Sequence, residues 1–168
     1  MIINVELSQS SISKAIEKLK KYRDSLKLKN ELFLRRLAET GIAVIDAKVA
    51  EAEGDSDKTH DVTFKVHSYG DYAWGTLTLM GNDILFIEFG SGIHYNSSNP
   101  EHASKFGYGV GTYPGQTHAF DPDGWWYRDS TGVAQHSYGT QATMPMLSAS
   151  RAMILTVRQI AREVYGSN

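Results

Sequence analysis

Apolar residues recur every three to four positions along the first third of the chain, which is the period of one face of an α-helix. Serines at residues 8–13 offer N-caps. We predict helices over residues 8–27 and 30–53, separated by a break near residues 27–30. Gly41 lies inside the second helix, where it costs on the order of 1 kcal/mol relative to Ala, so we expect close packing against another helix there. The apolar positions are Ile12, Ile16, Leu19, Tyr22 and Leu26, then Leu34, Leu37, Ile42, Ile45 and Val49.

The period changes to two beyond the second helix, which indicates strands with one buried face. Val62, Phe64 and Val66 alternate with polar residues in the first strand. Turn residues separate this run from a second alternating run, and again from a third run that is apolar enough to lie centrally. We therefore predict an antiparallel β-meander over about residues 60–89. Its strands are expected at residues 60–67, 72–80 and 84–89, with turns at residues 69–71 and 81–83.

A long insertion rich in glycine and aromatic residues follows the meander. Residues 90–142 hold nine of the fifteen glycines and two of the three tryptophans, which favours an ordered excursion over a flexible linker. Within it, residues 125–128 and 133–138 flank a turn and predict a second small hairpin. Pro145 then fits the first turn of a final helix over about residues 144–165. The whole pattern predicts an α+β fold in a single domain, with the final helix packed on the sheet.

Composition narrows the class of protein. With 41% hydrophobic and 21% charged residues, the chain has the make-up of a folded protein, and no stretch reaches the roughly 20 apolar residues of a membrane helix. The N-terminus lacks the pattern of a secretion signal, so we expect a protein made and kept in a cytoplasm. The absence of Cys excludes disulfides and thiol nucleophiles and agrees with a reducing compartment.

The formal net charge of -2 conceals an uneven distribution along the chain. Residues 1–36 hold nine Lys and Arg against four acidic residues, residues 37–129 hold five against fourteen, and residues 130–168 hold three against one. A basic helical face could contact DNA phosphates or an acidic neighbouring subunit, but a solvated face is the simpler interpretation because acidic residues are interspersed. A DNA-binding protein is usually far more basic overall.

Histidines in the insertion raise the hypothesis of a metal site with imidazole and carboxylate ligands. Their spacing matches no known metal motif, and scattered surface histidines are the simpler interpretation. Ser91 lacks the spacing of a nucleophile elbow. We therefore predict no cofactor, no metal and no enzymatic activity. The residues considered as ligands in the metal-site hypothesis are His94, His102, His118, His136, Asp121 and Asp123.

Three adjacent aromatic residues, Trp125, Trp126 and Tyr127, offer a large and rigid contact area. They could bind sugar or stack on bases, and their segment resembles one unit of the wall-binding repeats of secreted lytic enzymes. Those repeats act in tandem, whereas this unit is alone. Aromatics that anchor a hairpin onto the core or onto a neighbouring subunit are the simpler interpretation.

Several longer strings occur in a recognisable order along the chain. They are IEFGSGI at residues 87–93, GYGVGTYPGQ at residues 107–116, HAFDPDGWWY at residues 118–127 and QATMPM at residues 141–146. In these strings the chain resembles the minor tail or tail completion (neck, head-tail joining) proteins of long-tailed double-stranded DNA bacteriophages and Gram-positive prophages. The resemblance covers about residues 8–165 and is specific from 85 to 150.

The resemblance implies a structural virion protein of the neck or tail, added between the head portal and the tail tube as a ring subunit, with a hexamer expected. The implied partners are further copies of the chain and a portal adaptor, tail terminator or tail tube protein. Genomic DNA would pass through the lumen without specific binding, and the basic ends and acidic middle would let ring neighbours meet heterologously. The expected interface residues are Glu88, Phe89, Tyr108, Tyr113, Trp125, Trp126, Tyr127 and Arg128.

Two other functions are alternatives to the structural one. A phage-borne cell-wall-binding or wall-degrading protein would carry a signal peptide, tandem aromatic repeats or a catalytic constellation, none of which the sequence displays. A metal-dependent hydrolase built on His94, His102, His118 and the nearby Asp121 and Asp123 would contain stoichiometric metal.

Overall fold

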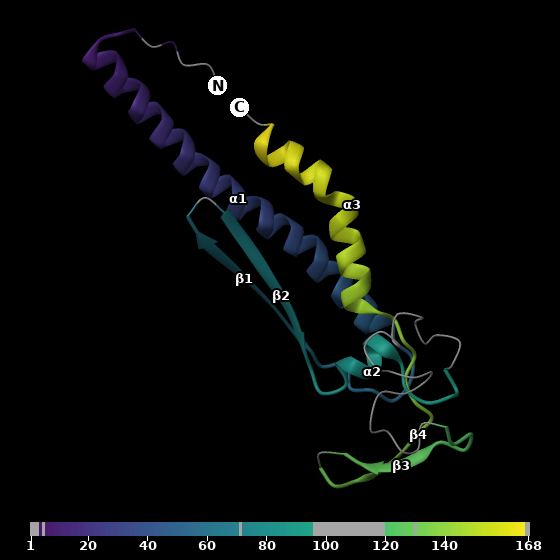
Figure 1. The fold of residues 1–168 in the computed structure, drawn as a ribbon. Coiled ribbons are helices and arrows are strands. Elements are labelled where there is room, and N and C mark those ends of the chain that lie inside the picture. Colours follow the sequence, from purple (N-terminus) through teal and green to yellow (C-terminus); the bar gives the residue numbers. More distant parts are fainter. Residues whose placement is uncertain (1–3, 5, 71, 96–119, 130, 167–168) are drawn as a thin grey trace.

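The computed structural model describes residues 4, 6–70, 72–95, 120–129 and 131–166 (Figure 1). The α+β class predicted from the sequence is confirmed. The described residues form a long helix near each end of the chain and, between these helices, two separate two-stranded antiparallel sheets. The elements are α1 (Gln9–Glu51), β1 (Asp61–Tyr69), β2 (Tyr72–Met80), α2 (Ile84–Phe89), β3 (Trp125–Arg128), β4 (Ala134–Ser137) and α3 (Pro145–Tyr165).

α1 is one continuous helix of 43 residues, so the predicted break near residues 27–30 is wrong. The segment there reads Lys-Leu-Lys-Asn and contains neither Gly nor Pro, while Lys and Leu are good helix formers. Ser8 is the N-cap, and its hydroxyl accepts the backbone N–H of Ser11 at 3.3 Å. Nothing in the local sequence therefore ends the first predicted helix before the second begins.

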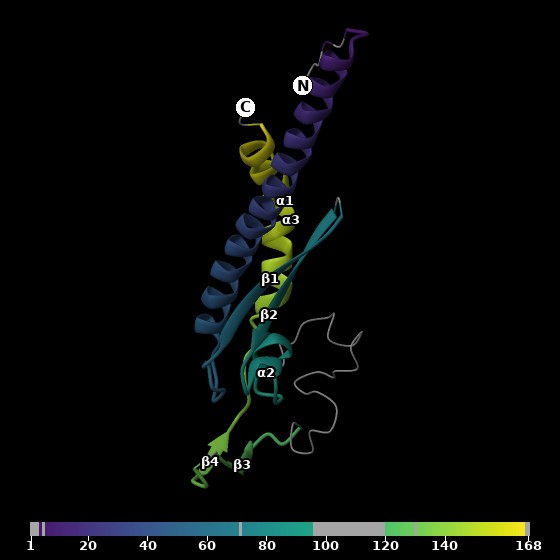
Figure 2. The same ribbon diagram turned by 90° about the vertical axis from the view of Figure 1, so that its left-hand side faces the viewer.

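α3 lies along the C-terminal half of α1, and the N-terminal half of α1 extends past the end of α3 (Figures 1 and 2). The two helices are joined near that end by an ion pair between Arg36 and Glu163 at 3.0 Å and by a hydrogen bond from the Tyr165 hydroxyl to Asn30 at 2.7 Å. The Phe33 and Tyr165 rings lie 5.8 Å apart between their centres. Residues 9–28 of α1 thus have no α3 beside them.

Gly41 lies where α1, β2 and α3 meet. A Cβ built on Gly41 would lie 3.0 Å from Leu77 Cδ2 in β2 and 3.0 Å from Met153 Sδ in α3. The close packing expected at Gly41 is confirmed, and it involves a strand as well as a helix. β2 pairs with β1 in an antiparallel register that places Phe64 opposite Leu77. Val62 of β1 and Leu77 and Leu79 of β2 pack against the core cluster, which includes Ile45 and Val49 of α1.

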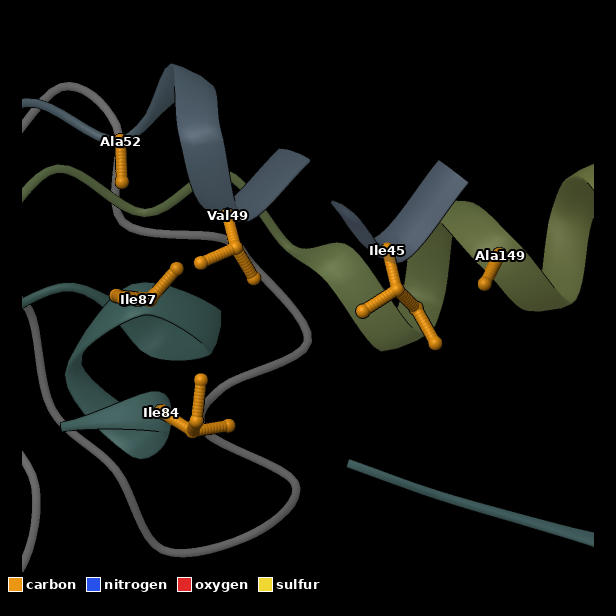
Figure 3. Packing of buried hydrophobic residues seen from close by; sticks show 6 residues of the cluster. All are labelled: Ile45, Val49, Ala52, Ile84, Ile87 and Ala149. Carbon is orange, nitrogen blue, oxygen red and sulfur yellow. The ribbon is translucent and has the colours of Figure 1, made fainter. Parts of the chain in front are cut away.

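The predicted third strand is a helix, α2, and the meander is a two-stranded hairpin. Ile84 and Ile87 are both buried, whereas Leu85 is 49% exposed, which is a helical and not an alternating pattern. α2 brings its two isoleucines against the end of α1 and the start of α3 (Figure 3). The buried core cluster consists of Ile45, Val49, Ala52, Ile84, Ile87 and Ala149.

The second hairpin predicted within the insertion is present as β3 and β4, with Trp125 opposite Ser137 and Arg128 opposite Ala134. It lies at the end of the molecule opposite to the N-terminal half of α1 (Figures 1 and 2). The predicted final helix is confirmed as α3. Among the helices of the described residues, none is long and apolar enough to cross a bilayer.

Candidate functional site

Glu88, in the string IEFGSGI, joins α2 to the start of α3. It is buried, with 7% of its surface exposed. Its two carboxylate oxygens accept the backbone N–H groups of Met146 at 2.8 Å and Leu147 at 3.2 Å, in the first turn of α3. The N-cap of α3, Met144, has a φ of 54° and makes no cap with its own side chain. Glu88 therefore supplies from another element the acceptor that a helix N-terminus needs.

Glycines bring two backbone segments into direct contact beside this junction. Ser91 and Thr140 exchange backbone hydrogen bonds, each with an N···O distance of 3.0 Å. Gly92 has a φ of 75°, and a Cβ there would lie 2.6 Å from the Tyr138 carbonyl oxygen. Gly139 has a φ of 104°, and its Cβ would lie 2.0 Å from the Ser91 carbonyl oxygen. Only glycine fits these two positions, so the contact depends on them.

A pocket of about 230 Å³ opens between these segments and β3. Asp55 and Asp83 contribute carboxylates to it, and Trp125 and Tyr127 contribute aromatic rings. Burial raises the pKa of the Tyr127 hydroxyl, and the negative charges of Asp55, Asp83 and Asp129 raise it further. The same charges and the ring faces favour a cation over an anion in this pocket. Its lining also includes Ser56, Phe86, Ser91, Ser137 and Thr140.

Aromatic rings cover the face of the β3–β4 hairpin. Trp126 is 71% exposed and contacts His136 on the opposite strand, with 4.9 Å between the ring centres. His136 contacts Tyr138 at 4.7 Å, and Tyr138 contacts His94 at 5.7 Å. The Asp129 carboxylate closes the turn by accepting two backbone N–H groups. The ring contacts and the hydrogen bonds of Asp129 therefore hold the hairpin in an ordered conformation that presents an aromatic surface.

The expected interface residues divide into three groups. Glu88 and Phe89 are buried within the chain, at 7% and 8% exposure, and their contact with a neighbouring subunit stays a prediction. Trp126, Tyr127 and Arg128 are exposed, and Trp125 is half-buried. Tyr108 and Tyr113 lie outside the described residues. The structure thus leaves β3 as the exposed part of the expected surface.

Within the described residues, no group of three or more His, Asp or Glu side chains is close enough to hold a metal ion. His94 and His136 belong to the aromatic contacts of the second hairpin. Asp121 accepts the backbone N–H of Asp123 at 3.0 Å and forms a turn. His102 and His118 lie outside the described residues, so the metal hypothesis is not tested by their positions.

A groove of about 600 Å³ lies away from the second hairpin, between the middle of α1 and the tip of the β1–β2 hairpin. From α1 it is lined by the apolar Leu19, Tyr22 and Leu26 and by the basic Arg23 and Lys27. Its further lining residues are Asp24, Asn30, Ser68, Gly70, Tyr72 and Ala73. The sequence signal for this surface was the helical spacing of the apolar residues, which predicts a buried face. The apolar residues do lie on one face of α1, but the described part of the chain covers that face only partly.

Comparison of the chain with protein-family models, with curated proteins and with solved structures finds no match.

Proposed function

We propose that the chain is a structural virion protein of the phage neck or tail, which joins or completes the tail at the head–tail interface as a ring subunit. The supporting observation is that the described parts of three of the strings behind the resemblance, at residues 87–93, 120–127 and 141–146, contact one another. Glu88 of the first string binds the backbone of Met146 in the last, at 2.8 Å. Trp125 of the third string lies beside Gly92 of the first, and a Cβ built on Gly92 would lie 3.2 Å from the Trp125 ring. Segments that are far apart in the sequence are thus in direct contact in one part of the structure.

Exposed apolar side chains are a second support. They occur on three separate surfaces, with Leu19 on α1, Trp126 on β3 and Leu155 on α3 exposed by 54%, 71% and 83%. Contiguous apolar surface on a folded protein commonly marks a protein–protein contact. A subunit in a ring contacts two neighbours of its own kind and the assemblies above and below, which needs several such surfaces. The partners proposed are further copies, a portal adaptor, a tail terminator or a tail tube, with a hexamer as the proposed ring.

Electron microscopy of lysates tests this function. A phage with an early stop codon in the gene is compared with the same phage complemented by a wild-type copy, which controls for effects on neighbouring genes. Free filled heads and free tails, or tails with a defective end, are the expected result. Intact joined particles at the wild-type ratio would contradict the proposal.

Wall binding is a second candidate, favoured by the exposed ring of Trp126 and by the brace that His136 provides at 4.9 Å. Such a ring could stack on sugar. The test is co-sedimentation of the purified chain with peptidoglycan, with Trp126→Ala as the comparison. Binding that is lost in Trp126→Ala, together with intact particles from the stop-codon phage, would favour this candidate over the structural one.

A further inference from the structure

The N-terminal half of α1 carries an apolar stripe that the described part of the chain leaves largely uncovered. Ile12, Ile16, Leu19 and Tyr22 are between 44% and 54% exposed, and they fall on one face of the helix. This half extends beyond α3 in both views (Figures 1 and 2). A solvated helix needs no such stripe, because its stability can come from charged and polar residues.

This end of the molecule is also strongly basic. Residues 9–36 hold nine Lys and Arg against three acidic residues. Arg23 and Lys27 line the groove beside Leu19 and Leu26. Two such helices packed against each other would bring like charges together, which disfavours a symmetric contact between two α1 stripes. The charge therefore favours an occupant that is acidic as well as apolar.

The part of the molecule around the β3–β4 hairpin has that chemistry. Residues 51–57 hold four acidic residues and no basic one, and residues 120–129 hold three against one. Asp55 lies against the second hairpin, since its carboxylate accepts the Tyr138 N–H at 3.2 Å. Trp126 stands out from this acidic end with 71% of its surface exposed. The β3–β4 hairpin is therefore aromatic and surrounded by acidic residues, whereas the groove is apolar and surrounded by basic residues. The two surfaces are complementary in both charge and hydrophobicity.

We infer that the groove between α1 and the β1–β2 hairpin receives the β3–β4 hairpin of a second copy of this chain, head to tail. Trp126 would contact the apolar wall formed by Leu19, Tyr22 and Leu26, and the acidic end would face Arg23 and Lys27. The two surfaces are different parts of the molecule, because the tip of the β1–β2 hairpin lies beside the middle of α1 and the β3–β4 hairpin lies beyond the C-terminal end of α1 (Figures 1 and 2). The contact is therefore heterologous and repeats from copy to copy. The inference rests on the proposed ring function and names the contact between its neighbours.

Two variants test the groove side and the hairpin side of this contact separately. The groove variant is Arg23→Glu with Lys27→Glu, and the hairpin variant is Asp123→Asn with Trp126→Ser. Lys14→Glu with Lys21→Glu is the groove control, because it changes the charge equally on helix positions that do not line the groove. Glu39→Gln with Leu85→Ser is the hairpin control, with the same kinds of change at exposed residues that take part in no proposed contact. Far-UV circular dichroism verifies that every variant is folded.

Sedimentation velocity over a concentration series measures the association of the full chain. We expect wild type and both controls to form species larger than a dimer, and each variant alone to associate roughly tenfold or more weakly. A 1:1 mixture of the two variants has one intact groove and one intact hairpin per pair. It should therefore form a dimer that does not grow, and added salt should weaken all of these species.

Several results would overturn the inference. Wild type that remains monomeric throughout would remove it, as would variants that associate as tightly as their controls. Loss of association in the groove variant alone, with normal assembly of the hairpin variant, would indicate a symmetric contact between two α1 helices. Head-to-tail assembly in solution together with normal particles from the stop-codon phage would keep the contact and reject the neck function, so the two failures are distinguishable.

Discussion

Glu88 accepts the backbone N–H of Met146 at 2.8 Å, across 58 positions of sequence. The bond ties the end of α2 to the first turn of α3, where N–H groups have no partner within the helix. The second carboxylate oxygen of Glu88 accepts the N–H of Leu147, at 3.2 Å. Because Glu88 is buried at 7% exposure, water would not replace this acceptor readily if it were removed.

Replacing Glu88 is expected to destabilise the fold. Glu88→Ala removes both acceptors from part-buried N–H groups and should lower the free energy of unfolding by about 2–3 kcal/mol. Glu88→Gln keeps one acceptor oxygen but loses the charge near the helix N-terminus, so a loss of about 1 kcal/mol is expected. Urea denaturation measures both. Glu39→Ala, at an exposed position on α1, is the control and should change stability by less than about 0.5 kcal/mol. Equal stability of Glu88→Ala and this control would refute the capping role.

Gly139 and Gly132 form a matched pair for the close backbone contact. Both have a positive φ, of 104° and 86°, but a Cβ would lie 2.0 Å from the Ser91 carbonyl oxygen at Gly139 and would meet nothing within 4 Å at Gly132. Gly132→Ala should cost about 1–2 kcal/mol from backbone strain alone. Gly139→Ala adds a backbone clash and should cost clearly more in urea denaturation. Similar losses for the two would mean that residues 138–140 move aside freely.

Elements with one clear pattern could be predicted from the sequence, and elements decided by tertiary contacts could not. The alternation of residues 72–80 and the helical spacing of α3 each admit one structure, and both predictions are confirmed. The six residues of α2 are nearly all apolar, and periodicity cannot distinguish a strand from a helix over so short a run. The helix places Glu88 against α3 and two isoleucines in the core, which depends on contacts far along the chain.

The candidate site divides in the same way. The exposure of Trp126 could be predicted, because adjacent aromatics on a short hairpin cannot all face inward. The role of Glu88 could not, since its partners are backbone groups that carry no sequence signal. The apolar stripe on α1 was visible as Ile12, Ile16 and Leu19, but spacing alone does not tell whether such a face is covered by the same chain.

His60 is expected to make stability depend on pH near neutrality. Its Nδ1 lies 2.8 Å from the Lys58 carbonyl oxygen and its Nε2 lies 3.0 Å from Asp46 Oδ1. Both partners are acceptors, so both ring nitrogens must carry a proton, and the Lys58 carbonyl and then Asp46 raise the pKa of His60 above its ordinary 6.5. The stabilisation is therefore fully present below about pH 6.5 and lost as pH rises through the raised value.

The NMR titration of the His60 ring measures this shift. Asp46→Asn removes the charged partner, so the pKa of His60 should fall toward its ordinary value but stay above it, because the Lys58 carbonyl remains. Asp46 is 56% exposed, and we expect the change in the free energy of unfolding to stay below about 1 kcal/mol. An unshifted His60 in the wild type would show that the two hydrogen bonds do not persist in solution.

Asp129 is expected to hold the turn of the β3–β4 hairpin only while it is ionised. Hydrogen bonds from the side chains of Thr131 and Gln135, then the backbone N–H groups of Thr131 and Val133, lower the pKa of Asp129 from 3.8 to about 2. Because the folded-state value is depressed, the support is present above about pH 3.8 and is lost as pH falls through about 2. The backbone amide proton shifts of Thr131 and Val133 should therefore titrate with a midpoint near 2. Asp129→Asn should abolish that titration, while the Phe64 amide in β1 reports whether the rest of the fold is intact. A midpoint at the ordinary value would mean that the hairpin is not closed by Asp129, and would remove the rigid aromatic surface on which the head-to-tail contact depends.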